Sequence, residues 1–122
     1  MKMTTFLDMD SQFSELDQSK YVLLSVPYDK TSTFQKGADL GPQAILDASD
    51  SIELYDVVTD NEAYTAGITT DDFQYNFDTP EAMVQSVYDR VKHFLNQKKT
   101  VGLLGGEHSV SVGAIKALSE KY

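Results

Sequence analysis

The stretch TVGLLGGEHS at residues 100–109 decides the fold, because an apolar run passes directly into two glycines and three polar residues. Continuous apolar character over residues 100–104 predicts a strand that is covered on both faces, as in a parallel sheet. The paired glycines allow the chain to turn sharply out of that strand, which places His108 along the carboxyl edge of the sheet. The apolar spacing over residues 110–118 then predicts a helix.

Upstream of this stretch lie the two other clear elements of the chain. The run YVLLSV at residues 21–26 is rich in apolar and β-branched residues and predicts a second covered strand. Residues 80–96 predict a long helix, since Thr79 can cap its start and apolar side chains recur at helical spacing. The order strand, helix, strand, loop and helix predicts an α/β fold with a mainly parallel sheet and right-handed crossovers.

The segment that follows the first strand is polar and irregular. Residues 28–42 predict a long loop, and Gly41-Pro42 predicts the start of a short helix, because proline fits the first helical position. The apolar side of this helix is expected to be formed by Ala44, Ile45 and Ala48.

Two more strands and a separate N-terminal segment complete the expected organisation. The pattern predicts a strand over residues 52–57 and another brief one over residues 63–68. Residues 1–19 are rich in Ser, Gln and Asp and predict a poorly ordered or loosely docked segment. The α/β domain is expected to occupy residues 20–122.

The composition indicates one soluble domain and excludes several classes of function. The chain has 122 residues, 41% of them hydrophobic, and its lack of cysteine excludes a disulfide scaffold, a thiolate zinc site and a cysteine nucleophile. With 19 acidic and 10 basic side chains, the net charge of −9 disfavours binding to nucleic acid or anionic lipid. No apolar run approaches the roughly 20 residues of a membrane-spanning helix, and no signal peptide is evident. We therefore expect a cytoplasmic protein.

The candidate chemistry lies at the carboxyl ends of the predicted strands, where ligands bind in parallel α/β sheets. The loops at residues 28–42 and 105–109 should face one crevice, and His108 presents there an imidazole, the commonest metal-binding group. A histidine that is only hydrogen-bonded near a helix start is the alternative. His93 falls on the polar side of its helix and is expected to be solvated. The Asp71-Asp72 pair could bind a cation or shape a loop.

Three motifs in order give the chain a resemblance to the agmatinase/arginase family of ureohydrolases. They are VPYD at residues 26–29, GADLGPQAI at residues 37–45 and LLGGEHS at residues 103–109. The resemblance spans residues 20–120, which is less than half of a complete family member. It implies a three-layer α/β/α fold, of which this chain is the N-terminal part, and a site with two manganese ions bridged by a hydroxide that attacks a guanidinium carbon to release urea.

The resemblance assigns His108 as the first metal ligand. Gly105, Gly106, Glu107 and Ser109 become supporting neighbours: Glu107 would orient the turn, and the Ser109 hydroxyl would cap the next helix. The other ligands of the family come from Asp-x-His-x-Asp and Asp-x-Asp motifs, and neither motif occurs here. No residue of this chain is therefore assigned a catalytic role, and the chain by itself is expected to be inactive.

The expected function of the complete protein is hydrolysis of a small guanidino compound. Agmatine, giving putrescine and urea, is favoured because Glu107 stands where many family members have Asp, a change common among agmatinase-like sequences. An arginase, guanidinobutyrase or formiminoglutamase remains an alternative, since Gln35-Lys36 and Leu46 stand where the family often has arginine. A non-catalytic α/β binding module is the alternative of another class. Family members form trimers or hexamers, so a homo-oligomer is expected.

Overall fold

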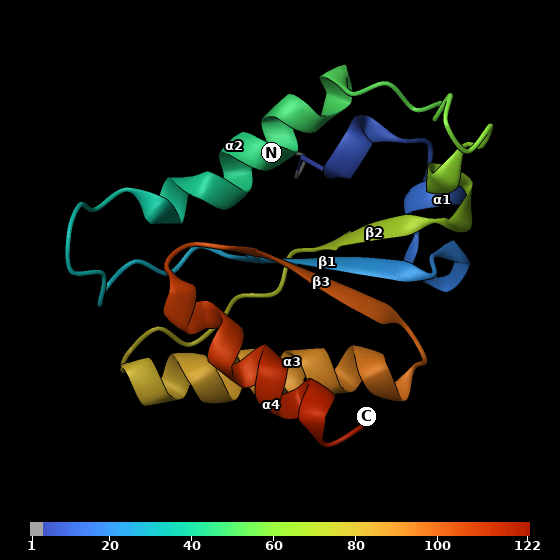
Figure 1. The fold of residues 1–122 in the computed structure, drawn as a ribbon. Coiled ribbons are helices and arrows are strands. Elements are labelled where there is room, and N and C mark those ends of the chain that lie inside the picture. The colour runs from blue at the N-terminus through green and yellow to red at the C-terminus, as the bar shows by residue number, and fades with distance from the viewer. Residues whose placement is uncertain (1–3) are drawn as a thin grey trace.

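A computed structural model of the chain describes residues 4–122 and contains one parallel sheet of three strands. The strands are β1 (Tyr21–Val26), β2 (Ile68–Asp71) and β3 (Thr100–Gly105). β1 lies in the middle and pairs in parallel with both neighbours, so the order is β2-β1-β3. Figure 1 shows all three strands running in the same direction.

Helices cover both faces of this sheet, so the predicted three-layer α/β/α architecture is confirmed. The short helix α2 (Gly41–Ala48) lies over one face, and α3 (Pro80–Asn96) and α4 (Ser111–Ser119) lie over the other (Figure 1). The chain passes from β1 to β2 over the first face and from β2 to β3 over the second. The two crossovers, from β1 to β2 and from β2 past β1 to β3, run in opposite directions across the sheet, so crossovers of the same hand must lie on opposite faces.

The main hydrophobic core lies between the sheet and the pair α3 and α4. Its fully buried members from the middle strand are Val22, Leu24 and Val26. The side chains that α3 contributes are Met83, Val87, Val91, Phe94 and Leu95. Each large side chain that is fully buried stabilises the fold by about 1.5–3 kcal/mol relative to exposure. The core therefore fixes the position of β1, from whose end the candidate site is built.

The predicted long helix is confirmed over residues 80–96. Its start is capped as expected, since the Thr79 hydroxyl accepts a hydrogen bond of 3.0 Å from the backbone of Ala82. The predicted strands at residues 21–26 and 100–104 and the helix beginning at Gly41 are also confirmed. The buried face of α2 differs from the expectation: it consists of Pro42 and Leu46, whereas Ile45 is half-exposed.

The strand expected over residues 52–57 is wrong. This segment has one isolated antiparallel bridge, between Asp56 and Asn61, and no ladder. The Asp56 carboxylate accepts hydrogen bonds from the backbone of Val58 and Thr59, so it holds a turn instead of an extended strand. The apolar residues of the pattern are exposed on this turn rather than packed in a sheet.

The strand expected over residues 63–68 is also wrong in most of its length. Residues 63–66 form a 3-10 helix, and β2 begins only at Ile68. Gly67 separates the two elements at a positive φ of 82°, where its backbone touches Gln18 so closely that a Cβ would lie 2.6 Å from the carbonyl oxygen. The strand therefore starts five residues later than the pattern indicates.

Residues 4–19 lie along β2 and provide hydrogen-bond partners for two of its buried polar side chains. The Thr69 hydroxyl donates a hydrogen bond to the carbonyl of Ser14. The Thr70 hydroxyl oxygen accepts one from the backbone N–H of Phe6, with an N–O distance of 2.9 Å. Three short helices occupy this segment: Phe6–Asp8, α1 (Ser11–Ser14) and Leu16–Gln18. The division of the chain at residue 19 stays a prediction, and residues 1–3 lie outside the described residues. Among residues 4–122, no helix is both long and apolar enough to cross a membrane.

Candidate functional site

The candidate site is a crevice between the carboxyl ends of β1 and β3. The loop after β1 leaves toward α2, and the loop after β3 leaves toward α4 on the opposite face, which opens a gap between two adjacent strands (Figure 1). This β1–β3 crevice has a volume of about 450 Å³ and is lined by residues 31–35, 38 and 106–109. The prediction that these two loops face one crevice is therefore confirmed.

The turn after β3 is fixed against the end of β1 by backbone contacts. The backbone N–H of Gly106 donates a hydrogen bond to the carbonyl oxygen of Val26 (N–O distance 3.0 Å). The backbone N–H of Glu107 donates one to the carbonyl oxygen of Tyr28 (2.9 Å). A Cβ at Gly106 would lie 2.0 Å from the Tyr28 carbonyl oxygen, so only glycine fits there. Gly105 does not line the crevice; it lies against Val110, whose Cγ2 would be 2.6 Å from an added Cβ.

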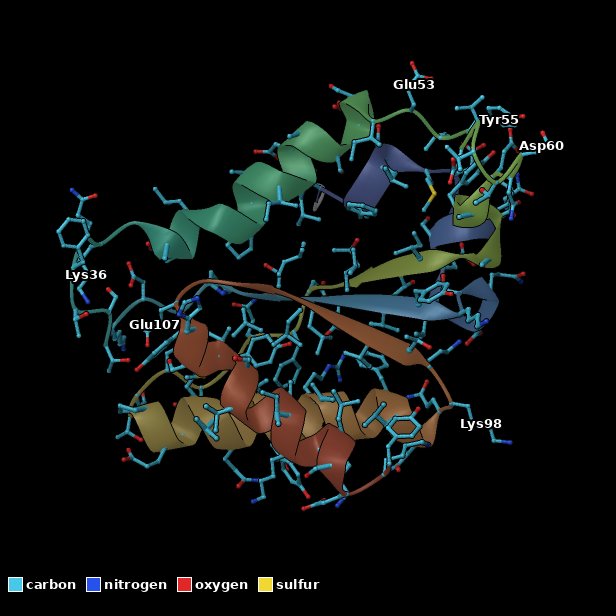
Figure 2. All side chains as sticks on the ribbon, in the orientation of Figure 1. Lys36, Glu53, Tyr55, Asp60, Lys98 and Glu107 are labelled. Atoms are coloured by element: carbon cyan, nitrogen blue, oxygen red, sulfur yellow. The ribbon has the colours of Figure 1, made fainter. Side chains whose placement is uncertain are left out.

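The Glu107 carboxylate joins the two loops of the crevice. It accepts hydrogen bonds from the Thr31 backbone (2.8 Å), the Thr31 hydroxyl and the Ser109 hydroxyl. Partial burial raises the pKa of the Glu107 carboxyl, but the bonds from Ser109 and Thr31 outweigh it, so the pKa lies below its usual value. Figure 2 shows Glu107 at the end of the molecule that also carries Lys36 of the first loop.

Two further contacts close the loop after β1. The Asp29 carboxylate accepts hydrogen bonds from the backbone N–H groups of Gly37 and Ala38, with N–O distances of 2.7 Å and 3.1 Å. The pKa of Asp29 lies below its usual value, first because of a hydrogen bond from the Ser32 side chain and then because of these backbone bonds. Gly37 adopts a positive φ of 121°, which glycine tolerates best. The loop therefore has a defined shape beside the crevice.

His108 lies in a short 3-10 helix, His108–Val110, that follows β3 directly. Its side chain is exposed and lines the crevice, and no hydrogen bond to its ring occurs within residues 4–122. The Ser109 hydroxyl, expected to cap the next helix, donates to Glu107 instead, and the Ser111 hydroxyl donates 2.6 Å to the His108 carbonyl. The imidazole is thus presented to solvent on a turn whose backbone is held on both sides.

The other histidine lies far from this crevice. His93 is exposed in the last turn of α3, and its Nε2 is 2.9 Å from the side-chain nitrogen of Gln97. The helix leads from there to Lys98, which Figure 2 places at the opposite end of the molecule from Glu107. His93 is exposed, as the sequence pattern predicts.

The donor groups around His108 do not make a metal site on their own. Over the described part of the chain, no group of three or more His, Cys, Asp or Glu side chains lies close enough together to hold a metal ion. Sequence reasoning missed Thr31 and Asp29, which shape the crevice through hydrogen bonds. Asp29 belongs to the VPYD motif, whereas no pattern in the sequence points to Thr31.

Comparisons with known proteins identify a matching family and similar proteins of two kinds. The sequence profile of the arginase family matches residues 19–122. The N(1)-aminopropylagmatine ureohydrolase of Synechocystis sp. is 32% identical over 119 residues, which cover 93% of this chain and 39% of that protein. The agmatinase of Bacillus subtilis is 28% identical over 113 residues, which cover 88% of this chain and 38% of that protein.

A solved structure supports the fold independently. The agmatine ureohydrolase of Thermoplasma volcanium superposes with a TM-score of 0.78 at 24% identity and covers 96% of this chain, but only 39% of its own chain is matched. This chain thus spans about two-fifths of the length of the relatives it matches.

Proposed function

The chain belongs to the arginase family, and from this premise we propose that it forms part of the active site of a manganese-dependent ureohydrolase. In this proposal His108 is a metal ligand, and the remaining ligands come from polypeptide outside these 122 residues. The substrate is a small guanidino compound, most suitably agmatine, which is hydrolysed to putrescine and urea. The names of the relatives from Synechocystis sp. and Bacillus subtilis support this substrate class.

The observation that carries the proposal is the position of the His108 ring. It is exposed at the carboxyl end of β3, in a crevice between strands whose loops leave to opposite faces. Its backbone is held by the Gly106 and Glu107 contacts to β1, so the ring has a defined place from which to bind a ligand.

The residues of this chain do not fit a manganese pair by themselves. His108 supplies one nitrogen, and Glu107, the nearest carboxylate in sequence, accepts hydrogen bonds from Thr31 and Ser109. Manganese prefers carboxylate and other oxygen ligands, and a two-metal site needs several of them. We therefore expect no urea release from the 122-residue chain with agmatine and excess manganese; release above the rate without protein would contradict this.

The supporting roles follow from the contacts. Gly106 lets the turn approach the Tyr28 backbone closely, Gly105 leaves room for Val110, and Glu107 with Ser109 holds the turn against Thr31. These residues position His108 rather than contact the substrate. We further propose that the complete enzyme is cytoplasmic and forms a trimer or hexamer.

A chimeric enzyme tests the proposal. The segment of the Bacillus subtilis agmatinase that aligns with this chain is replaced by residues 19–122, and urea release from agmatine is measured together with bound manganese. The parent chimera and its His93→Asn variant should be active. His108→Asn should lower the activity about a hundredfold or more, because loss of a residue that only hydrogen-bonds a metal ligand already lowers metal affinity or activity 10–100-fold. An active His108→Asn chimera, or one that keeps full manganese content, contradicts the assignment.

A second candidate is a non-catalytic α/β binding module. It is favoured by the lack of a complete metal site within residues 4–122. The same chimera separates the two: a module that only shares the scaffold would fold there without restoring urea release in any variant.

A further inference from the structure

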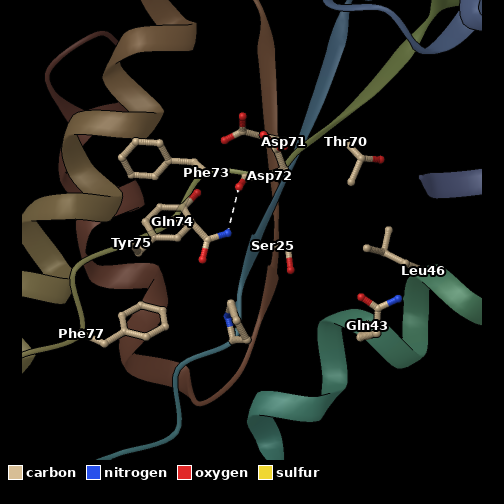
Figure 3. Close-up of a pocket in the computed structure, with 11 residues that line it drawn as sticks. Ser25, Gln43, Leu46, Thr70, Asp71, Asp72, Phe73, Gln74, Tyr75 and Phe77 are labelled. Atoms are coloured by element: carbon tan, nitrogen blue, oxygen red, sulfur yellow. Dashed lines mark hydrogen bonds between the residues drawn. The ribbon is translucent and has the colours of Figure 1, made fainter. Parts of the chain in front are cut away.

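A second crevice lies on the other side of β1, between the carboxyl ends of β1 and β2. It arises for the same reason as the first, since the loop after β1 and the segment after β2 leave to opposite faces. This β1–β2 crevice has a volume of about 400 Å³. Figure 3 shows Gln43 and Leu46 of α2 on one wall and Phe73, Tyr75 and Phe77 on the other.

The charged groups of this crevice are acidic. Asp71 is buried and forms a two-point ion pair with Arg90, at 2.8 Å to Nε and 2.6 Å to a terminal nitrogen. Asp72 is exposed and forms no ion pair within the described residues. No Lys or Arg lines the crevice, and none occurs between residues 37 and 89. Lys30 reaches only the Phe77 carbonyl, to which it donates at 2.6 Å.

The aromatic wall already holds one cation from within the chain. The Arg90 guanidinium lies 4.6 Å from the ring centres of both Phe73 and Phe94 while it pairs with Asp71. Cations are attracted to aromatic faces, and the attraction is larger where water is partly excluded. Of these two rings only Phe73 belongs to the wall; Tyr75 and Phe77 line the same crevice and offer further aromatic surface to a cation, with Asp72 as its counter-ion.

Two side-chain amides of the crevice, those of Gln43 and Gln74, leave their carbonyl oxygens free within the described part of the chain. The Gln43 amide nitrogen donates 2.7 Å to Asp47, and the Gln74 amide nitrogen donates 3.1 Å to the Asp72 carbonyl. Both amide carbonyl oxygens are then left without a donor among the described residues. The Tyr75 hydroxyl oxygen is buried and has no partner in the same residues. The two amide oxygens can therefore accept hydrogen bonds from a bound donor.

We propose that the β1–β2 crevice binds a primary alkylammonium ion, with its nitrogen beside Asp72 and its alkyl stem along the aromatic wall. An ammonium group has three donors and no acceptor, which matches the free carboxylate and amide oxygens. The apolar stem packs against Leu46, Tyr75 and Phe77, whereas an anion would meet Asp72 without a basic partner. This site is separate from His108 and does not depend on the ureohydrolase proposal.

A titration of the 15N-labelled 122-residue chain tests this site with three probes of matched shape. n-Butylammonium chloride should shift the backbone amide signals of residues 70–77 and the side-chain amide of Gln43, with saturation. Neutral butan-1-ol and sodium butyrate, at equal ionic strength, should bind at least fivefold more weakly or not at all. Asp72→Asn should weaken n-butylammonium binding about 1.5- to fivefold, the range for an exposed ion pair.

Asp78→Asn is the matched control, because Asp78 is an exposed carboxylate of the same segment that does not line the crevice. It should leave the dissociation constant unchanged. Equal binding of n-butylammonium and butan-1-ol, wild-type affinity in Asp72→Asn, or shifts confined to other parts of the chain would each overturn the proposal.

Discussion

The two crevices that flank β1 have the same topological origin but different construction. At β3 the gap is shaped by backbone contacts, since Gly106 and Glu107 bond to the end of β1 and the wall is a glycine-containing turn. At β2 it is shaped by side chains, with an aromatic wall on one side and α2 on the other. The topology of a parallel sheet therefore opens both gaps, and local residues decide which chemistry each one can perform.

Each crevice also uses one acid for structure and leaves one polar group free. Glu107 is bonded to Thr31 and Ser109, which leaves the ring of His108 open. Asp71 is bonded to Arg90, which leaves Asp72 open. The pattern separates residues that hold the crevice from residues that can meet a ligand.

Gly106→Ala should give the largest effect and should break the β1–β3 crevice. An added Cβ would meet the Tyr28 carbonyl oxygen at 2.0 Å, and a backbone atom cannot move aside as a flexible side chain can. We expect the free energy of unfolding in urea to fall by about 3 kcal/mol. Gly41→Ala is the control, since its Cβ would meet only Gly105 at 3.5 Å; its change should stay within about 1 kcal/mol. Equal stability of the two variants would contradict the described turn.

Arg90→Met should have the next largest effect and should act on the β1–β2 crevice. It leaves the Asp71 carboxylate, which is 7% exposed, without its partner. Removal of one member of a buried pair costs 3–5 kcal/mol, and because Arg90 is 23% exposed we expect about 2 kcal/mol. Lys92→Met, which breaks the exposed pair with Glu120, should change the free energy of unfolding by less than about 0.5 kcal/mol. A reversed order would show that Asp71 is not held as described.

Asp29→Ala should give the smallest effect, confined to the loop of the β1–β3 crevice. At neutral pH the amide signals of Gly37 and Ala38 should move toward unstructured positions, because both lose the carboxylate that accepts from them. Asp39→Ala, an exposed acid in the same loop, is the control and should leave them in place.

The same contact predicts a pH dependence in the wild-type chain. The folded pKa of Asp29 lies below its ordinary value of 3.8, so its contribution to stability is present above that value. It is lost as the pH falls below 3.8 through the folded pKa. The Gly37 and Ala38 amide signals should therefore shift in that window, and signals that are independent of pH there would contradict the contact.

The sequence predicts the β1–β3 crevice well because its determinants are local. Two covered strands, a capped helix and a Gly-Gly turn each leave a short signature, and the turn puts His108 at the sheet edge. The sequence cannot show that the Glu107 carboxylate joins the two loops, because its partner Thr31 lies 76 residues away and belongs to no motif. The expected use of Ser109 as a helix cap was wrong for a local reason, since its hydroxyl donates to Glu107 two residues earlier.

β2 shows why the rest of the fold could not be predicted. Thr69, Thr70 and Asp71 are polar yet buried, because Ser14, Phe6 and Arg90 satisfy them from distant parts of the chain. Apolar alternation therefore pointed to residues 52–57 instead, where the Asp56 turn leaves the hydrophobic side chains exposed. The β1–β2 crevice depends on β2, so it could not be predicted from the sequence either.

The most direct test of the central claim is whether the ring of His108 is an open metal ligand. Mn²⁺ is added in substoichiometric amounts to the 15N-labelled chain, and the paramagnetic broadening of amide signals is compared among the wild type, His93→Asn and His108→Asn. We predict that residues 31–35 and 106–110 broaden in the first two proteins and lose that broadening in His108→Asn, while broadening near acidic surface groups stays the same. Unchanged broadening around the crevice in His108→Asn would contradict the account.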